Sequence, residues 1–254
     1  MKKIIDTFIR DIKRLNNRNI LLRLTANEAL PHLQAGQFVE VQVNAPNVFL
    51  RRPISVHFYD AEKNELWLLV QLVGKATHEM SLLKQGDSLN LVLPLGTPFS
   101  MPTVANQQLL LVGGGVGVAP LLYLGAKLKE HGHQVSFLLG GRTKDDLLQI
   151  EEFQKYGQVH ITTEDASWGE RGFVTQHSIL QKEKFDFIYT CGPTPMMQAV
   201  ARYAQQQNIE CEVSLENKMA CGVGACLCCV TDTKEGHKCV CTEGPVFNIK
   251  ELKW

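Results

Sequence analysis

A group of cysteines near the carboxyl end of the chain has the residue type and spacing that an iron-sulfur cluster needs. Cys221, Cys226 and Cys229 follow the pattern C-x4-C-x2-C, and further cysteines stand downstream. This is the plant-type spacing of a 2Fe-2S cluster, in which a tight loop wraps three thiolates around the irons and a later segment brings the fourth. Gly222 and Gly224 allow the backbone angles of such a loop and bring amide groups close to the cluster sulfurs. The pattern predicts an electron carrier that ends in a one-electron centre.

The choice of ligands is only partly determined by this spacing. The x4-x2 rule selects Cys229 over its neighbour Cys228, but it does not decide between Cys239 and Cys241 for the fourth position. A structural zinc site also uses four thiolates, but it usually pairs C-x2-C with a second C-x2-C. A disulfide framework needs an oxidising compartment, and charged residues from Asp6 onward interrupt any signal peptide at the amino end. The iron-sulfur interpretation is therefore preferred.

Length and composition limit the other function classes. The chain has 254 residues, enough for two domains and a small appendage. Lys plus Arg and Asp plus Glu both number 26, so no net charge favours nucleic acid or an anionic membrane as a partner. No apolar run approaches the roughly eighteen residues of a membrane span. Eight cysteines without an export signal predict a reducing cytoplasmic location and cysteines used for metal.

The elements that position the cysteines fall into three predicted domains. Residues 1–102 contain short alternating runs separated by turn residues, which predicts a small antiparallel β-barrel. The predicted strands are 20–25, 37–43, 65–73 and 88–93, and a helix is expected over 77–84 with Thr77 as its cap. Residues 103–217 alternate strands with helices, which predicts an α/β parallel-sheet domain. Residues 218–254 are then a small cluster-binding module.

The α/β region holds a candidate dinucleotide site. A strand at 108–112, a glycine turn at 113–120 and a helix from 121 form the context that a pyrophosphate needs, because glycines let the backbone approach and a helix amino end attracts anions. Further strands are expected at 135–141, 159–163 and 185–191, with a helix over 194–207. Cys191-Gly192-Pro193 ends a strand, which is where open α/β sheets bind ligands. His133, His160 and His177 show no ligand-like spacing and are expected to be structural.

In the barrel, Arg52-Pro53-Ile54-Ser55 resembles the R-x-x-S strand of the ferredoxin reductase superfamily. There the arginine holds the flavin pyrophosphate and the serine contacts the isoalloxazine, because a guanidinium matches phosphate and a hydroxyl can bond a ring nitrogen. Gly74-Lys75-Ala76-Thr77 resembles the phosphate loop of the same superfamily, with Ala76 in place of its second glycine. Gly113 to Pro120 is similar to its G-G-x-G-x-x-P nicotinamide turn. Gln71 departs from the arginine that many members have on the flavin strand.

Taken together, the motifs resemble the electron-transfer subunits of type B, NAD-dependent dihydroorotate dehydrogenases along the whole chain. The series is R-P-I-S, G-G-G-x-G-x-A-P, C-G-P, E-x-x-M-A-C-G-x-G-A-C-x-x-C and C-x-x-G-P-V-F. The resemblance implies FAD contacts at Arg52, Pro53, Ile54, Ser55, Leu69, Val70, Gln71, Gly74, Ala76 and Thr77. It implies nicotinamide contacts at Gly113, Gly114, Gly115, Gly117, Pro120, Cys191, Gly192 and Pro193, with Ser55 and Cys191 nearest the reacting rings. It selects Cys241 as the fourth ligand beside Cys221, Cys226 and Cys229, with Cys228 and Cys239 as spares.

The resemblance also implies a function and a partner. Electrons would pass between NAD(H), FAD, the 2Fe-2S cluster and the FMN of a dihydroorotate dehydrogenase catalytic subunit, in a heterotetramer of two copies of each chain that makes orotate for pyrimidine biosynthesis. No residue here looks like an orotate site, as expected of a subunit that cannot complete the reaction alone. We expect the cluster loop, 221–229, to lie near the partner surface.

Two alternatives were weighed. Related reductase subunits that serve ferredoxin or a sulfur acceptor share this layout, and Arg142, which could meet a 2′-phosphate, favours such an NADPH-linked reading. The residues after it look like an ordinary helix cap, so NADH is expected. A non-catalytic redox sensor would not need both a flavin strand and a nicotinamide turn.

Overall fold

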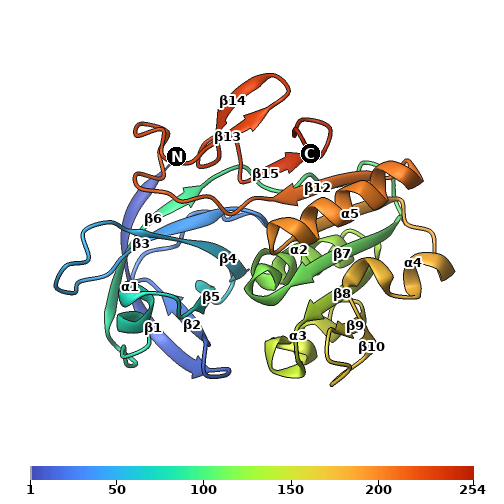
Figure 1. Ribbon diagram of the computed structural model, residues 1–254. Helices are drawn as coiled ribbons and strands as arrows, with labels where there is room; N and C mark the ends of the chain where they lie inside the picture. Colours follow the sequence, from blue (N-terminus) through green and yellow to red (C-terminus); the bar gives the residue numbers. More distant parts are fainter. Residues whose placement is uncertain (1) are drawn as a thin grey trace.

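The amino-terminal half of the molecule is a closed antiparallel barrel, seen on the left of Figure 1 in a computed structural model that describes residues 2–254. Its strands are β1 (Lys3–Arg14), β2 (Asn19–Thr25), β3 (Phe38–Gln42), β4 (Arg52–Asp60), β5 (Glu65–Gln71) and β6 (Ser88–Leu95), hydrogen-bonded in the order β1-β2-β5-β4-β3-β6. Alternate residues point inward, and Leu22, Leu24, Val39, Val41, Leu66 and Leu68 are fully buried in the barrel. The period-two pattern thus produced the predicted fold, because successive side chains of a strand face opposite sides.

Two local features of the barrel differ from the sequence expectation. β1 was not predicted, because polar residues outnumber apolar ones in it and only Ile5, Thr7 and Ile9 are buried. The helix α1 spans Lys75–Met80 rather than 77–84, and Gly74 is its N-cap. Thr77 lies in the first turn, where its hydroxyl accepts a hydrogen bond from the Gly74 N–H at 3.1 Å. Thr77 therefore bonds the backbone just before the helix, and the first amides of α1 have no side-chain cap.

The second half is a seven-stranded sheet, on the right of Figure 1. Its strands are β7 (Gln108–Gly114), β8 (Gln134–Gly141), β9 (Gln158–Thr163), β10 (Glu170–Arg171), β11 (Phe187–Cys191), β12 (Glu210–Ser214) and β15 (Val246–Asn248), in the order β10-β9-β8-β7-β11-β12-β15. All neighbours are parallel except β12 and β15, which are antiparallel. The predicted parallel α/β sheet is confirmed, with one added strand from the end of the chain.

Helices cover both faces of this sheet. They are η1 (Gly115–Val118), α2 (Ala119–Glu130), η2 (Lys144–Asp146), α3 (Ile150–Gln154), η3 (Val174–Gln176), α4 (Ile179–Lys182) and α5 (Thr194–Gln207). α2 and α3 share one apolar core with the barrel, whereas α4 and α5 pack on the other face together with the carboxyl-terminal segment. The alternation of Leu109 and Leu111 with Leu110 and Val112 along β7 divides the strand between these two cores. None of the helices described in residues 2–254 is long and apolar enough to cross a membrane.

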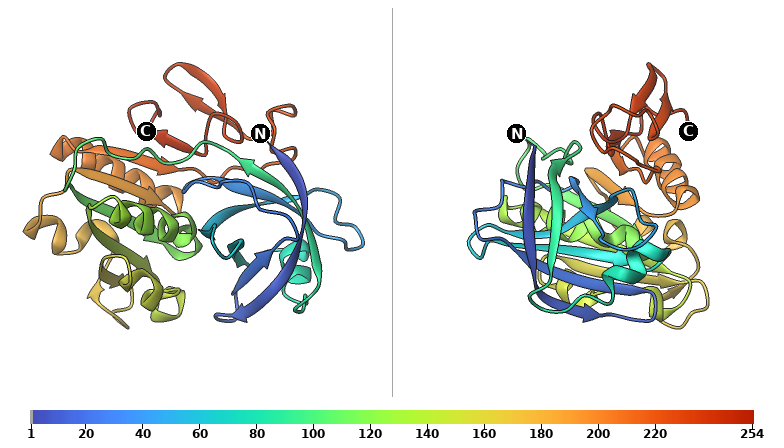
Figure 2. Two further views of the ribbon diagram at one scale, coloured as in Figure 1. Left: turned by 180° about the vertical axis from the view of Figure 1, so that it is seen from behind. Right: turned by 90° about the vertical axis from the view of Figure 1, so that its left-hand side faces the viewer.

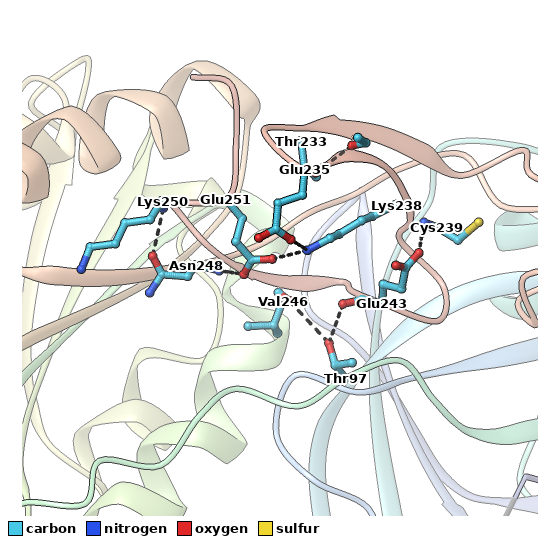
Figure 3. Close-up of polar contacts among 11 residues, drawn as sticks. Thr97, Thr233, Glu235, Lys238, Cys239, Glu243, Val246, Asn248, Lys250 and Glu251 are labelled. Atoms are coloured by element: carbon cyan, nitrogen blue, oxygen red, sulfur yellow. Dashed lines mark hydrogen bonds and ion pairs between the residues drawn. The ribbon is translucent and has the colours of Figure 1, made fainter.

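The cysteine-rich end of the chain lies across both halves, at the top of Figure 1 and projecting from the body in the right-hand view of Figure 2. It contains the hairpin β13 (Val230–Thr233) and β14 (Gly236–Cys239). Figure 3 shows its polar contacts, in which Lys238 binds Glu235 at 3.0 Å and Glu251 at 2.8 Å. The backbone N–H of Thr97, from the barrel, donates to the carbonyl of Gly244 at 2.6 Å. Because β15 also joins β12, this segment is packed against the sheet and the barrel at the same time.

Candidate cofactor cleft and metal centre

The glycine turn and the Cys191 turn meet where the order of the sheet reverses. β8 and β9 lie on one side of β7, and β11 and β12 lie on the other, so the switch point falls between β7 and β11. Gly113 and Cys191 are register partners at the carboxyl ends of these two strands. A Cβ on Gly117 would lie 2.4 Å from the Cα of Gly192, so only glycine allows the two turns to come this close. Ligands of open α/β sheets bind at this position.

A cleft of about 210 Å³ opens from the switch point towards the barrel. Ten of the predicted cofactor residues line it: Arg52, Pro53, Ile54, Ser55, Leu69, Gln71, Thr77, Gly117, Pro120 and Cys191. They come from β4, β5 and α1 on the barrel side and from η1, α2 and β11 on the sheet side. The structure therefore brings the flavin-strand motif and the nicotinamide-turn motif to one cavity.

The other predicted cofactor residues do not line this cleft. Val70 and Ala76 are buried in the barrel core, at 0% and 1% exposure, and Gly74 is exposed at the start of α1. The remaining five belong to the backbone of the two turns: Gly113, Gly114, Gly115, Gly192 and Pro193. The side chains of Val70 and Ala76 are thus placed to pack rather than to bind, and any role of the turn glycines lies in their backbone.

One wall of the cleft was missed by the sequence reasoning. It is formed by the end of β12 and the segment after it, through Ser214, Leu215, Glu216, Asn217 and Met219. The other unpredicted lining residues come from elsewhere around the cleft and are Phe38, Val73, Val116, Ala119 and Pro245. A signal for part of this wall was present, because Glu216 and Met219 belong to the E-x-x-M-A-C motif that leads into the cluster cysteines. Only the fold shows that the first residues of this motif, Glu216 and Met219, line the cleft.

Arg52 supplies an uncompensated positive charge to the cleft. Its guanidinium donates to the carbonyls of Leu50 at 2.6 Å and Arg51 at 3.2 Å, and within residues 2–254 it forms no ion pair with a carboxylate. The amino end of α1, with Thr77 at its first turn, faces the same cavity. A free guanidinium beside polar backbone groups suits a phosphate group, so the residues present fit a flavin diphosphate.

Cys191 is placed to pack rather than to react. It is 6% exposed, and burial raises the pKa of its thiol far above the ordinary value of 9.0. A thiol that stays protonated at neutral pH is a poor nucleophile. Its neighbour across the cleft, Ser55, keeps a hydroxyl available at the barrel wall. The cleft therefore offers a small apolar thiol on one side and a hydrogen-bonding group on the other.

The four predicted cluster ligands lie close together as two pairs. The thiol of Cys226 contacts that of Cys221, and the thiol of Cys229 contacts that of Cys241. Amides point at these sulfurs, since Gly224 N lies 3.1 Å from Cys241 Sγ and Cys241 N lies 3.4 Å from Cys229 Sγ. Such N–H groups are a means of tuning an iron-sulfur cluster.

The two pairs differ in environment. Hydrogen bonding from the Val223 amide, followed by contacts with Cys226, lowers the pKa of Cys221 to about 6. Burial, followed by the neighbouring Cys229, raises the pKa of Cys241 to about 12. Cys226 is exposed, whereas Cys229 and Cys241 are buried. Metal binding releases thiol protons, so it would have to displace a more tightly held proton at Cys241 than at Cys221.

Of the spare cysteines, Cys239 lies near the two pairs, because burial, followed by the neighbouring Cys229, Glu243, Cys221 and Cys226, raises the pKa of its thiol. Cys228 is exposed, and Cys239 is half-buried at the end of β14, opposite Val230 of β13. Across residues 2–254 no three His, Cys, Asp or Glu side chains converge closely enough to hold a single metal ion. Two contacting thiol pairs are compatible with an iron-sulfur cluster, which four thiolates hold. The choice of Cys229 and Cys241 over their neighbours stays a prediction that this pairing supports.

Two other depressions contain none of the predicted cofactor residues. One of about 660 Å³ lies beside His133 and Gln134, and one of about 440 Å³ lies beside His160 and His177. These histidines show no ligand-like spacing in the sequence, but the ring centroids of His160 and His177 lie 5.6 Å apart in the fold. Both depressions are away from the switch point, so we place the candidate site in the smaller cleft.

Comparison with known proteins agrees with this architecture. Residues 216–253 match the family model described as the iron-sulfur cluster binding domain of dihydroorotate dehydrogenase B, and residues 111–202 match the oxidoreductase NAD-binding domain. The chain is 39% identical over 233 residues to the dihydroorotate dehydrogenase B (NAD(+)) electron transfer subunit of Shouchella clausii, covering 89% of each chain. It is 40% identical over 229 residues to the corresponding subunit of Bacillus cereus strain Q1, covering 86% of each.

Solved structures show the same fold. A chain from the structure of an NADH-dependent reduced ferredoxin-NADP oxidoreductase superposes with a TM-score of 0.88 at 31% identity, covering 98% of this chain and 90% of that one. The cytochrome b5 reductase domain of Ulva prolifera nitrate reductase superposes with a TM-score of 0.67 at 16% identity, covering 82% of this chain and 94% of that domain. At that identity the likeness concerns the fold alone.

Proposed function

Because the chain belongs to the family of electron transfer subunits of NAD⁺-dependent dihydroorotate dehydrogenase B, we propose that it passes electrons between NAD(H) and the FMN of a catalytic subunit through FAD and a 2Fe-2S cluster. The observation that carries this route is the continuity of one segment. Ser214 to Met219 form a wall of the cleft, and the chain then reaches the first cluster cysteine, Cys221, after a single residue. The cleft and the metal centre are therefore neighbours along the chain as well as in space.

The barrel side of the cleft is assigned to the flavin. Arg52 would bind the diphosphate, and Ser55 and Gln71 would contact the ring from neighbouring strands. The sheet side is assigned to the nicotinamide, with Gly117 and Pro120 at the pyrophosphate turn and Cys191 at the ring. When bound, FAD supplies the exchange of electron pairs with nicotinamide and of single electrons with an iron-sulfur centre. The chain itself would orient the two rings from the two sides of the cleft.

The partner surface is assigned to the exposed side of the cluster loop. Val223 and Leu227 are 44% and 64% exposed, and Cys226 is exposed between them. Exposed apolar side chains beside a cluster ligand suit a surface that a second protein covers. We propose an FMN-containing catalytic subunit in this place, in a complex of two copies of each chain. Free thiols as ligands also suit a reducing cytoplasm.

The proposed function is tested with both chains present. The subunit is co-expressed with a type B dihydroorotate dehydrogenase catalytic subunit and purified without oxygen, and NADH-dependent reduction of orotate is measured. The expected result is activity that requires both chains, one FAD per chain, and iron and acid-labile sulfide in equal amounts. Zinc in place of iron, or orotate reduction by the catalytic subunit alone at the same rate with NADH, would refute the proposal.

A second candidate is supported by the superposition at a TM-score of 0.88 with a chain of a ferredoxin-NADP oxidoreductase. A reductase subunit serving ferredoxin would use the same cleft and the same cluster. The two candidate functions can be distinguished by the protein partner that the chain binds and by its preference for NADH or NADPH. Failure to bind the catalytic subunit, together with faster reduction of artificial acceptors by NADPH than by NADH, would favour the ferredoxin-linked function.

A further inference from the structure

A buried carboxyl group with no partner lies directly beneath the cluster loop. Glu40 is 1% exposed, and neither of its carboxyl oxygens has a hydrogen-bond partner within residues 2–254. Buried polar groups in proteins are nearly always hydrogen-bonded, because water cannot replace the missing partner. The two unpaired carboxyl oxygens of Glu40 therefore indicate a position where a hydrogen-bonding partner is expected.

The position of Glu40 in β3 places it against the cluster loop rather than in the barrel. Its neighbours Val39 and Val41 point into the barrel core, so Glu40 faces outward. A Cβ on Gly222 would lie 2.7 Å from Cγ of Glu40 and 3.0 Å from its Oε1. Gly222 follows the first cluster cysteine, and Figure 1 shows the chain after β12 passing along the outer side of β3 on its way to the cysteines. The loop therefore rests on this side chain.

The same residue touches the flavin side of the route. In the barrel sheet Glu40 is paired with Pro53 of β4 and with Val92 of β6. Pro53 lines the cofactor cleft next to Arg52. Glu40 thus lies between the strand assigned to the flavin and the loop assigned to the cluster.

The surrounding charges leave Glu40 without an ion-pair partner. Arg51 is a neighbouring cation, but its guanidinium donates to Gln42, to both oxygens of Asn90 and to the backbone carbonyl of Glu40, not to the Glu40 carboxyl. Burial raises the pKa of Glu40 to about 7; Arg51 and Arg52 oppose this increase, and Cys221 adds to it. An anionic cluster in the loop would favour the neutral acid further.

We propose that Glu40 is a positioning residue for the metal centre: as a neutral carboxylic acid it supports the loop at Gly222 and would donate its O–H to a sulfur atom of the bound cluster. This inference rests on the proposed function, since it requires an iron-sulfur cluster at these cysteines. A hydrogen bond to a cluster sulfur stabilises the reduced, more negative state and so raises the reduction potential. Glu40 would therefore adjust the potential step between flavin and cluster without binding metal.

Two variants of similar size test this role in the complete complex. Glu40→Gln keeps a hydrogen-bond donor without ionising, and Glu40→Met keeps the length of the side chain without a donor. The midpoint potential of the cluster is measured by EPR-monitored redox titration at neutral pH, with FAD and iron content determined on the same samples. We expect a potential close to wild type in Glu40→Gln and a lower potential in Glu40→Met.

The matched control is Glu65→Gln, which alters another buried glutamate of the barrel. Glu65 begins β5 opposite Asp60, at the far end of β4 from Arg52, and its carboxylate is bound by Arg10. It should not change the cluster potential. An unchanged potential in Glu40→Met would overturn the inference.

The direction of the shift distinguishes the remaining outcomes. A rise in both Glu40 variants would mean that the carboxyl is ionised, which also overturns the inference. If Glu40→Met loses its iron while Glu40→Gln keeps iron and potential, the supporting role is upheld. A wild-type complex without an iron-sulfur EPR signal would instead refute the proposed function.

Discussion

The cluster loop and the cofactor cleft are two sites of the proposed redox route, but they are built in opposite ways. The loop takes all four predicted metal ligands from one short stretch, Cys221 to Cys241, and amides of the same stretch point at the sulfurs. The cleft takes its walls from segments between Phe38 and Pro245. The geometry of a site made by one short segment is set by that segment, whereas the geometry of the cleft is set by the packing of the barrel against the sheet.

The largest expected effect is at the locally encoded site. Cys226→Ser should abolish the EPR signal of the cluster and lower NADH-dependent orotate reduction in the complex by roughly 100-fold or more, because a hydroxyl is a poor iron ligand. Reduction of the bound FAD by NADH, followed by stopped-flow absorbance, should remain within about threefold of wild type. Cys228→Ser is the matched control, since Cys228 is exposed and outside both thiol pairs. A cluster lost equally in both variants would show that the pairing described here is wrong.

On the cleft side, Arg52→Ala should weaken FAD binding by about 10- to 100-fold, the equivalent of a lost charge-assisted hydrogen bond. The dissociation constant is measured by titrating the deflavinated complex with FAD and following fluorescence quenching. Arg51→Ala is the neighbouring control, because Arg51 is already bound to Asn90 and Gln42. It should lower thermal stability more than FAD affinity. If both variants lost FAD to the same extent, the assignment of Arg52 would fail.

One added methyl group can disrupt the contact between the glycine turn at Gly117 and the turn at Gly192. Gly117→Ala places a Cβ 2.4 Å from Gly192 Cα, which should cost about 1–3 kcal/mol of stability through overpacking and slow the reduction of FAD by NADH. Gly132→Ala provides the control, because its φ is +82° but no atom lies within 4 Å of the new Cβ. It should cost stability without affecting FAD reduction. Unfolding in denaturant and stopped-flow reduction give the two quantities, and equal rates in the two variants would contradict the turn contact.

The smallest effect concerns the pH dependence of the contact between the halves. His57 of β4 is fully buried, with Nδ1 2.7 Å from the carbonyl of Ala119 and Nε2 2.6 Å from the side-chain amide of Gln149. A neutral ring donates from Nδ1 to the carbonyl and accepts at Nε2 from the NH2 group of that amide. Burial lowers the pKa of His57 from 6.5, so as the pH falls through that value the unfolded chain takes up a proton that the folded chain resists. Stability from the neutral ring is therefore present above pH 6.5 and lost below it.

His57→Asn removes this titration. The variant should be less stable than wild type at pH 7.5 by about 1–3 kcal/mol, because buried hydrogen bonds are lost. Between pH 7.5 and pH 5 its free energy of unfolding should fall less than that of wild type, as measured by urea denaturation at each pH. A slope identical to wild type would show that His57 does not carry the pH dependence.

Some features of this protein follow from its sequence alone. The spacing of Cys221, Cys226 and Cys229 indicated a metal loop without any fold, because ligands within a few residues can meet through local backbone geometry. Period-two alternation indicated the barrel, and the change to strand-turn-helix units indicated the parallel sheet. Pro120 and the glycines before it located the turn because few residues tolerate that backbone.

Other features were decided only by the tertiary structure. The register of β7 against β11 placed Gly113 beside Cys191. The packing of the cluster loop on β3 placed Gly222 over the outward-facing side chain of Glu40. The wall at Ser214 to Met219 formed because β12 and β15 hold that segment against the barrel. These contacts join residues far apart in the chain, and no local pattern of residue types encodes which distant surface a side chain will meet. The predicted metal loop can therefore be recognised from the sequence. The cleft, and the position of the Glu40 carboxyl group between the cleft and the loop, form only in the folded protein.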